Sequence, residues 1–340
     1  MELQKSEIEG IKECIAQNQI FAITTHTNPD GDAVGSTLAL AGVLKSLGKN
    51  VRVIMPNDCP DFLKWLEGYN TILVFDKHTE EASSFLHAAD VIFCLDYNNP
   101  SRLEDMGKVI EDTQKPLVLI DHHPYPECNA VYKISETTAC STAELVYRTV
   151  IDCGFESAIT KEVAEALYTG IITDTGGLVH NSGHPELYQI VAKLLSLGIN
   201  KDYIHDQIFN VYSFDRMKLM GAVLKDNFVF FPEYNAAYMF ITIQNQKDYN
   251  FQLGDSEGLV NLPLSVKNIK FCALFTEYPN AMTKVSFRSK DSFPANAFSA
   301  EFFNGGGHLN AAGGRLHCSL HDALAIFEKG LHSYKQLLTS

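Results

Sequence analysis

The chain has 340 residues, which exceeds the roughly 250–300 residues at which a single hydrophobic core stops growing, so two domains are expected. Hydrophobic residues make up 46% and charged residues 20% of the chain, a globular composition that excludes a disordered or fibrous protein. The net charge of -14 disfavours a sequence-independent grip on long nucleic acid, because the surface as a whole repels phosphate backbones.

The first residues alternate charges with apolar residues at helical spacing, without the basic cap and apolar run of a signal peptide. No stretch approaches the ~20 apolar residues of a membrane span. We therefore expect a cytoplasmic protein with no membrane partner. The eight cysteines include no CxxC pair, which disfavours a zinc knuckle and favours reduced, buried thiols.

In the first half of the chain, short apolar or β-branched runs alternate with helical segments. The predicted strands are 20–25, 51–55, 71–75, 91–95 and 117–120. The predicted helices are 33–47, 141–153 and 161–173. This alternation is typical of a parallel sheet covered by helices on both faces.

The pattern then becomes helical throughout and is followed by longer, alternating strands and an amphipathic helix at 321–338. We predict an α/β protein with a parallel-sheet domain at 1–184, a helical connector at 185–225 and a smaller mixed-sheet domain at 226–340. The connector suggests a hinge, so the active site is expected in the cleft between the two domains.

Asp and His residues follow the ends of several predicted elements, where ligands bind in open α/β sheets. In chain order they are His26, Asp30, Asp32, Asp96, Asp121, His122, His123 and Asp174. Each has an ordinary explanation when taken alone. Residues 28–31 are typical of a turn, Asp32 could cap the following helix, and the paired histidines could be one core and one solvated residue.

Taken together, the five aspartates among these residues would converge at one sheet edge, with no Lys or Arg in the same segments. Their mutual repulsion would raise their pKa values and destabilise the fold unless positive charge is added. Two divalent metal ions would supply it. Carboxylate and imidazole ligands favour Mn²⁺ or Mg²⁺, with Zn²⁺ or Fe²⁺ as alternatives. A two-metal centre is suited to in-line attack on phosphorus, so phosphoester hydrolysis is expected.

The order and context of these motifs resemble the DHH phosphoesterases: HTNPDGDAVGS (26–36), Asp96 after a strand, Asp121-His122-His123, and Asp174. The later segments SFRS (286–289) and GGGHLNAAGG (305–314) resemble a DHHA1 domain. Within the family the chain is most similar to the nano-RNase type. That resemblance implies hydrolysis of short oligoribonucleotides to mononucleotides, of adenosine 3′,5′-bisphosphate to AMP, or of linear dinucleotides.

The resemblance also implies a ligand set for two metal ions that share Asp96, with Mn²⁺ expected first and Mg²⁺ second. The implied ligands are His26, Asp30 and Asp96 for one metal, and Asp32, Asp96, His122 and Asp174 for the other. A hydroxide bridging both metals would be the nucleophile. His123 would face the scissile phosphate as a catalytic residue, and Asp121 would orient the histidines.

The second domain is expected to bind the substrate. The candidate residues are Arg288, Gly305, Gly306, Gly307, His308 and Asn310, which offer a guanidinium fork, close backbone N–H groups and polar side chains to a phosphate. The alternatives are ordinary ones. A glycine could cap a helix at 295–303 in the left-handed conformation, and Arg288 could lie at a solvated strand end.

Two other functions remain open at this point. A family II inorganic pyrophosphatase shares the first domain but normally presents a basic cluster in the second, and a non-catalytic nucleotide sensor would have lost ligands. The expected partners are short RNA or nucleotide substrates, with no long nucleic acid. A homodimer is expected because it is the commonest state of soluble oligomers.

Overall fold

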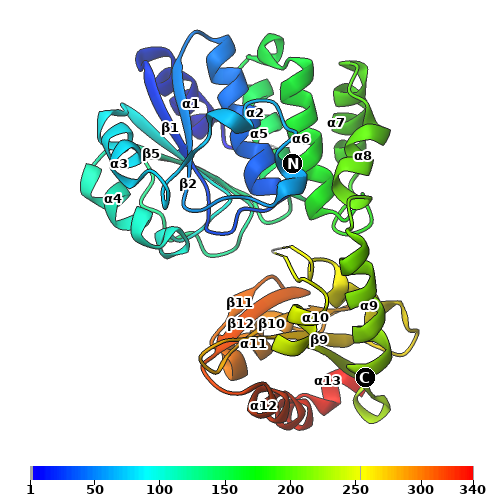
Figure 1. Ribbon diagram of the computed structural model, residues 1–340. Helices are drawn as coiled ribbons and strands as arrows, with labels where there is room; N and C mark the ends of the chain where they lie inside the picture. Colours follow the sequence, from blue (N-terminus) through cyan, green and yellow to red (C-terminus); the bar gives the residue numbers. More distant parts are fainter. Residues whose placement is uncertain (1–2, 253, 340) are drawn as a thin grey trace. The chain divides into compact units, whose positions relative to one another are not determined.

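The computed structural model describes residues 3–252 and 254–339 (Figure 1). Contacts between residues divide the chain into two compact units, one ending at Val211 and the other beginning at Tyr212. The division falls inside the helical segment 185–225 that we interpret as a connector. Within the described residues, no helix has the length and apolarity needed to cross a membrane.

The first unit is built on a parallel sheet of six strands in the order β3-β2-β1-β4-β5-β6, as the alternating pattern predicted. Its strands are β1 (Ile20–Thr24), β2 (Asn50–Met55), β3 (Leu73–Val74), β4 (Val91–Leu95), β5 (Leu117–Asp121) and β6 (Tyr132–Ser135). Strand β3 is shorter than predicted because a 3-10 turn occupies Tyr69–Thr71. The sequence did not indicate β6, a four-residue edge strand.

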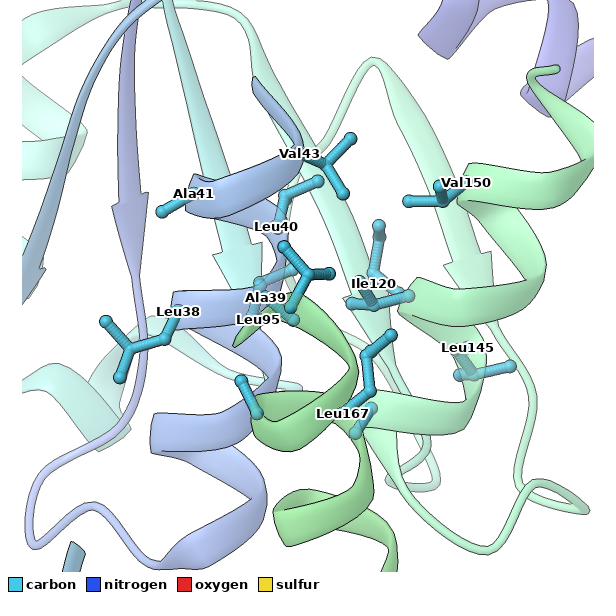
Figure 2. Close-up of a cluster of buried hydrophobic side chains, with 14 of the residues drawn as sticks. Leu38, Ala39, Leu40, Ala41, Val43, Leu95, Ile120, Leu145, Val150 and Leu167 are labelled. Atoms are coloured by element: carbon cyan, nitrogen blue, oxygen red, sulfur yellow. The ribbon is translucent and has the colours of Figure 1, made fainter. Parts of the chain in front are cut away.

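Helices cover both faces of this sheet (Figure 1). The helices of this unit are α1 (Lys5–Gln17), α2 (Gly31–Ser46), α3 (Thr79–Ala88), α4 (Asp105–Thr113), α5 (Thr142–Asp152), α6 (Lys161–Asp174), α7 (Pro185–Ser196) and α8 (Lys201–Phe209), of which α7 and α8 pack against α6. Helices α3 and α4 bury one face and α1, α2, α5 and α6 bury the other. Figure 2 shows Leu40, Leu95, Ile120 and Leu167 meeting in the larger core. Each such buried side chain stabilises the fold by roughly 1.5–3 kcal/mol.

Glycines bring α2 and α6 into backbone contact. A Cβ on Gly35 would lie 2.5 Å from the Ala166 carbonyl oxygen, and one on Gly170 would lie 2.8 Å from Asp32 Oδ1. No larger residue fits at either position without moving a helix. The first turn of α2 and the last turn of α6, which ends at Asp174, are therefore held at a distance set by the backbone.

The second unit contains a six-stranded sheet in the order β11-β12-β10-β9-β8-β7, with β8 and β9 parallel and the other pairs antiparallel. The mixed sheet predicted here is confirmed. Its strands are β7 (Phe228–Phe231), β8 (Ala236–Ile241), β9 (Phe271–Tyr278), β10 (Met282–Ser289), β11 (Gly306–Gly307) and β12 (Ala311–Leu316). Its helices are α9 (Phe214–Asp226), α10 (Ile243–Asp248), α11 (Ala295–Phe303), α12 (Leu320–Ser333) and α13 (Lys335–Thr339).

This second sheet also has two covered faces. A largely aromatic core that includes Phe271, Phe287 and Phe298 lies under α11 and α12, and aliphatic residues of α9 and of the 3-10 segment Leu259–Ser265 cover part of the other face. The helix predicted at 321–338 is two helices, because α12 ends before Tyr334, whose ring packs edge-on against Phe298 at 5.3 Å between centroids.

Candidate metal centre

The loop after β1 places a histidine and a carboxylate together. Asp30, rather than Asp32, is the N-cap of α2, and its Oδ1 accepts hydrogen bonds from Asp32 N and Ala33 N at 3.1 Å each. The other oxygen, Oδ2, lies 4.0 Å from His26 Nε2. His26 Nδ1 lies 2.8 Å from the Thr27 carbonyl oxygen, a contact that leaves Nε2 available as an acceptor. Capping the helix and presenting a ligand are thus compatible roles of Asp30.

Asp96 lies between two groups of side chains. It follows β4 in the left-handed conformation, with φ of 63°, and is buried. Its Oδ2 is 3.5 Å from His26 Nε2 and its Oδ1 is 3.7 Å from His122 Nε2. Left-handed backbone costs a residue other than glycine about 1 kcal/mol or more, and such strain is concentrated at functional sites. One carboxylate oxygen therefore faces each histidine.

The second group joins the ends of three elements. His122 Nε2 lies 3.4 Å from Asp174 Oδ2 at the end of α6 and 4.0 Å from Asp32 Oδ2 in the first turn of α2. The buried Asp32 carboxylate accepts hydrogen bonds from Thr142 N at 2.6 Å and Ala143 N at 2.8 Å, at the N-terminus of α5. These bonds fix its orientation toward His122.

The carboxylates of this centre repel one another. The pKa of Asp32 is raised well above its ordinary value, first by burial and then by the carboxylates of Asp96, Asp174 and Asp30. Burial also acts to raise the pKa of Asp96, but the surrounding histidines outweigh it and lower that pKa. A buried carboxylate that other carboxylates drive toward protonation marks a place where a cation would be stabilised.

The donor atoms fit metal ions. Within the first unit, the sets of three whose donor atoms lie within 4.8 Å of one another are His26, Asp30 and Asp96; Asp32, His122 and Asp174; and Asp96, Asp121 and His123. The first two sets correspond to the ligands expected for each metal from the sequence, with Asp96 adjoining both. Carboxylates and imidazoles without a thiolate are the donors that suit Mn²⁺ and Mg²⁺.

Asp121 and His123 form a pair beside these two sets. Asp121 is fully buried, and its Oδ1 accepts the hydrogen of His123 Nδ1 at 2.8 Å. Among the described residues, Asp121 Oδ2 is buried without a hydrogen-bond partner. Asp121 therefore fixes the ring of His123.

Arg102 is a residue of this centre that the sequence did not indicate. Its Nη1 lies 3.2 Å from His123 Nε2, and its backbone carbonyl accepts a hydrogen bond from Thr27 N at 2.9 Å. It is located in a 3-10 turn at Pro100–Leu103. The guanidinium comes close to His123 because this turn runs back toward β1. The spacing of Arg102 in the sequence did not predict that contact.

The N-terminus of α5 was also missed, although a signal was present. Ser141 Oγ caps the helix by accepting a hydrogen bond from Glu144 N at 3.1 Å, which corresponds to the S-x-x-E pattern of a helix start. The buried Glu144 carboxylate accepts from Cys140 N at 2.9 Å and Arg148 Nη2 at 2.6 Å. This network holds the turn whose N–H groups bind Asp32.

In the second unit, the glycine loop is a tight hairpin between β11 and β12. A Cβ on Gly305 would lie 1.9 Å from the Gly313 carbonyl oxygen, and Gly307 has φ of 137°. Helix α11 is capped in the left-handed conformation by Asn304, with φ of 49°, so the glycines are not its cap. Gly306 is exposed, and an added Cβ would meet no atom within 4 Å.

The other candidate residues of this unit lie next to the hairpin. His308 N donates to the Ala311 carbonyl at 2.8 Å. Asn310 Nδ2 donates to Ser289 Oγ at 2.9 Å, which ties the loop to the end of β10. Arg288 is paired with Ala311 across β10 and β12, and its Nη1 donates to the Phe287 carbonyl at 2.9 Å.

Comparison with known proteins identifies the family. Residues 20–171 match the model of the DHH family N-terminal domain, and residues 233–332 match the DHHA1 domain. The chain belongs to the DHH family. It is therefore a metal-dependent hydrolase acting on phosphoester bonds, and the resemblance seen in its sequence is confirmed.

The chain is similar to two relatives over almost its whole length and shares its fold with a third protein. An exopolyphosphatase-related protein from Bacteroides fragilis, known as a crystal structure, is 42% identical with a TM-score of 0.96, covering 99% of both chains. The bifunctional oligoribonuclease and PAP phosphatase NrnA of Thermus thermophilus is 29% identical over 318 residues, 93% of this chain and 90% of that one. RecJ from Thermus thermophilus, in complex with Mn²⁺, is 14% identical with a TM-score of 0.56, covering 99% of this chain and 55% of RecJ, and shares the fold.

Proposed function

We propose that the protein hydrolyses short oligoribonucleotides to mononucleotides and removes the 3′-phosphate from adenosine 3′,5′-bisphosphate. The single observation that carries this proposal is the meeting of two carboxylate and histidine groups at the buried Asp96. The name of the Thermus thermophilus NrnA, whose length this chain covers almost completely, supports the substrate class.

Two metal ions belong to the proposal. The residues that would hold them are His26, Asp30 and Asp96 on one side, and Asp32, Asp96, His122 and Asp174 on the other. We propose Mn²⁺ as the working ion and Mg²⁺ as its substitute. When bound, such a pair polarises a phosphoryl oxygen and activates water.

The remaining side chains of the centre have distinct proposed roles. Asp121 orients His123, whose Nε2 faces Arg102 Nη1 at 3.2 Å. The Arg102 guanidinium has further N–H donors and a permanent positive charge, which suit a non-bridging phosphate oxygen. His123 would face the scissile phosphate and help to polarise it or to protonate the leaving oxygen. In the second unit, Arg288 and the loop with Gly305, Gly306, Gly307, His308 and Asn310 would bind the rest of the substrate.

A polyphosphate is the second candidate substrate. The Bacteroides fragilis relative is 42% identical over nearly the whole chain, and its description as exopolyphosphatase-related favours inorganic polyphosphate over pyrophosphate alone. Both inorganic substrates therefore belong in any test of the proposal.

The test is a substrate panel with purified protein and Mn²⁺. It contains labelled RNA dimers to pentamers, adenosine 3′,5′-bisphosphate, linear diadenylate, pyrophosphate and polyphosphate. Release of mononucleotides supports the proposal. Phosphate release from the inorganic substrates alone would contradict it, and binding without turnover would indicate a sensor. Light scattering of the same sample tests the predicted homodimer.

A further inference from the structure

One face of the second sheet carries two cations directly opposite each other. In β10, Val285 and Phe287 point into the aromatic core, so Lys284 points to the other face. In β12, Ala312 belongs to that same core, so Arg315 points away from it. Lys284 and Arg315 are register partners across the two antiparallel strands.

This pairing is unfavourable for the fold by itself. Like charges directly opposite each other on neighbouring strands destabilise a sheet. In a chain with 41 acidic and 27 basic residues, carboxylates are abundant, yet within 3–252 and 254–339 no ion pair is formed by Lys284 or Arg315. Desolvation by the surrounding protein, and then the charge of Arg315, lower the pKa of Lys284. The Glu257 carboxylate acts to raise it. A bound anion would relieve this repulsion.

An aromatic ring adjoins the two cations. In β9, Phe271, Ala273 and Phe275 face the aromatic core, so Tyr278 faces the side of Lys284 and Arg315. Tyr278 is half-buried. Its register partner in β10 is Met282, two residues from Lys284 on the same face. Burial raises the pKa of Tyr278, and the Arg315 guanidinium opposes that rise. Cations beside a partly exposed aromatic ring are the combination by which proteins bind single-stranded nucleic acid.

We propose that Lys284, Arg315 and Tyr278 form a subsite for a further nucleotide of an oligoribonucleotide, an inference that rests on the proposed function. Its phosphate lies between the two cations and its base stacks on the tyrosine ring. Lys284 is four residues from Arg288 on the same face of β10, a separation of roughly 13 Å along the strand. A nucleotide at this subsite is therefore different from one whose phosphate Arg288 binds. Substrates of several nucleotides use the subsite, and adenosine 3′,5′-bisphosphate does not.

The test compares a pentaribonucleotide with adenosine 3′,5′-bisphosphate. In the double variant Lys284→Ala and Arg315→Ala, KM for the pentamer is expected to rise about tenfold with kcat unchanged, while KM for the bisphosphate stays the same. The slope of log Kd against log salt concentration for the pentamer is expected to fall by about 0.7, the value for one neutralised phosphate on a single strand. The control double variant, Lys247→Ala and Lys329→Ala, changes the net charge equally at exposed positions of the same unit.

Tyr278 is tested separately. Tyr278→Ala should weaken pentamer binding by roughly fivefold to a hundredfold, whereas Tyr278→Phe, which keeps the ring, should bind like the wild type. Fluorescence anisotropy of a labelled pentamer in EDTA measures this binding without turnover. Circular dichroism melting confirms that each variant is folded.

The outcomes separate this proposal from the proposed function. An unchanged pentamer affinity in the double variant, or an equal loss for the bisphosphate, overturns the subsite while leaving the activity intact. Failure of the wild type to hydrolyse any ribonucleotide overturns the proposed function. In that case, pentamer binding in EDTA that depends on Lys284 and Arg315 would still support the subsite, and no such binding would overturn it.

Discussion

The buried carboxylate of Asp32 accepts a 2.6 Å hydrogen bond from the backbone N–H of Thr142, in the first turn of α5. The hydroxyl of the same threonine donates to Asp96 Oδ1 at 3.0 Å. One residue thus fixes two carboxylates that come from different elements. Because a helix N-terminus stabilises negative charge, this contact also offsets part of the repulsion between them.

Replacing Thr142 by valine tests this contact. Thr142→Val keeps the backbone N–H to Asp32 and removes the hydroxyl bond to Asp96, so Mn²⁺ affinity is expected to fall about tenfold or more. Isothermal titration or electron paramagnetic resonance of Mn²⁺ gives the affinity. The matched control is Thr149→Val in the same helix, whose hydroxyl donates to the Leu145 carbonyl at 2.8 Å. Equal affinities in both variants would exclude a role for the hydroxyl.

Asp96 lies next to both proposed sets of metal ligands. Asp96→Asn is expected to reduce turnover by more than about 100-fold, the upper range for residues that only position a ligand. Metal content measured by elemental analysis should fall together with activity. Near-normal turnover in this variant would show that Asp96 does not join the two metals.

Metal binding should stabilise the folded protein. At a free Mn²⁺ concentration about 100 times the Kd, linkage adds about 2.7 kcal/mol, which corresponds to a rise in Tm of roughly 5–10 °C. Differential scanning calorimetry with Mn²⁺ and with EDTA measures the shift. Asp174→Ala should reduce it, whereas Asp152→Asn, an exposed change at the end of α5, should not. A full shift in Asp174→Ala would remove Asp174 from the proposed ligands.

The contact between α2 and α6 predicts a large effect of a single methyl group. Gly35→Ala places a Cβ 2.5 Å from the Ala166 carbonyl oxygen and is expected to lower the free energy of unfolding by about 1–3 kcal/mol. Gly221→Ala in α9 is the control, because an added Cβ there meets no atom within 4 Å. It is expected to stabilise by about 0.5–1 kcal/mol through helix propensity. Urea denaturation that gave both variants the same sign would contradict the packing.

Asp58 predicts a pH dependence away from the metal centre. Burial acts to raise its pKa, but the hydrogen bonds from Lys77 and Tyr69 outweigh it and lower the pKa from 3.8 to about 2. Because the folded-state pKa lies below the unfolded one, the stabilisation is complete above about pH 4 and is lost as the pH falls toward 2.

Asp58→Asn is therefore expected to cost about 1 kcal/mol at pH 7, after allowance for solvent screening, and less at pH 3. Urea denaturation at both values measures the difference. Asp61→Asn, at an exposed carboxylate that pairs with Lys64, is the control and should have little effect at either pH. A constant cost of Asp58→Asn from pH 7 to pH 3 would argue against the lowered pKa.

The sequence indicated the parallel sheet and the carboxylates at its edge, because both depend on local features: buried runs of strand length and polar residues where those runs end. It did not indicate Arg102, which reaches His123 only through the path of a turn. It also did not indicate the contact from α5 to Asp32, which joins residues 110 positions apart. The edge strand β6 was missed because its half-exposed residues show no clear alternation.

The crossing of α2 and α6 has a consequence for how such an enzyme changes over time. At Gly35 and Gly170 no side chain of either residue separates the helices that carry Asp32 and Asp174, so the spacing there is set by direct contact. A change of preferred ion is then expected in the loops that bear His26, Asp96 and His122. The helix pair keeps Asp32 and Asp174 at a fixed separation, whereas the loops can change during evolution without altering that separation.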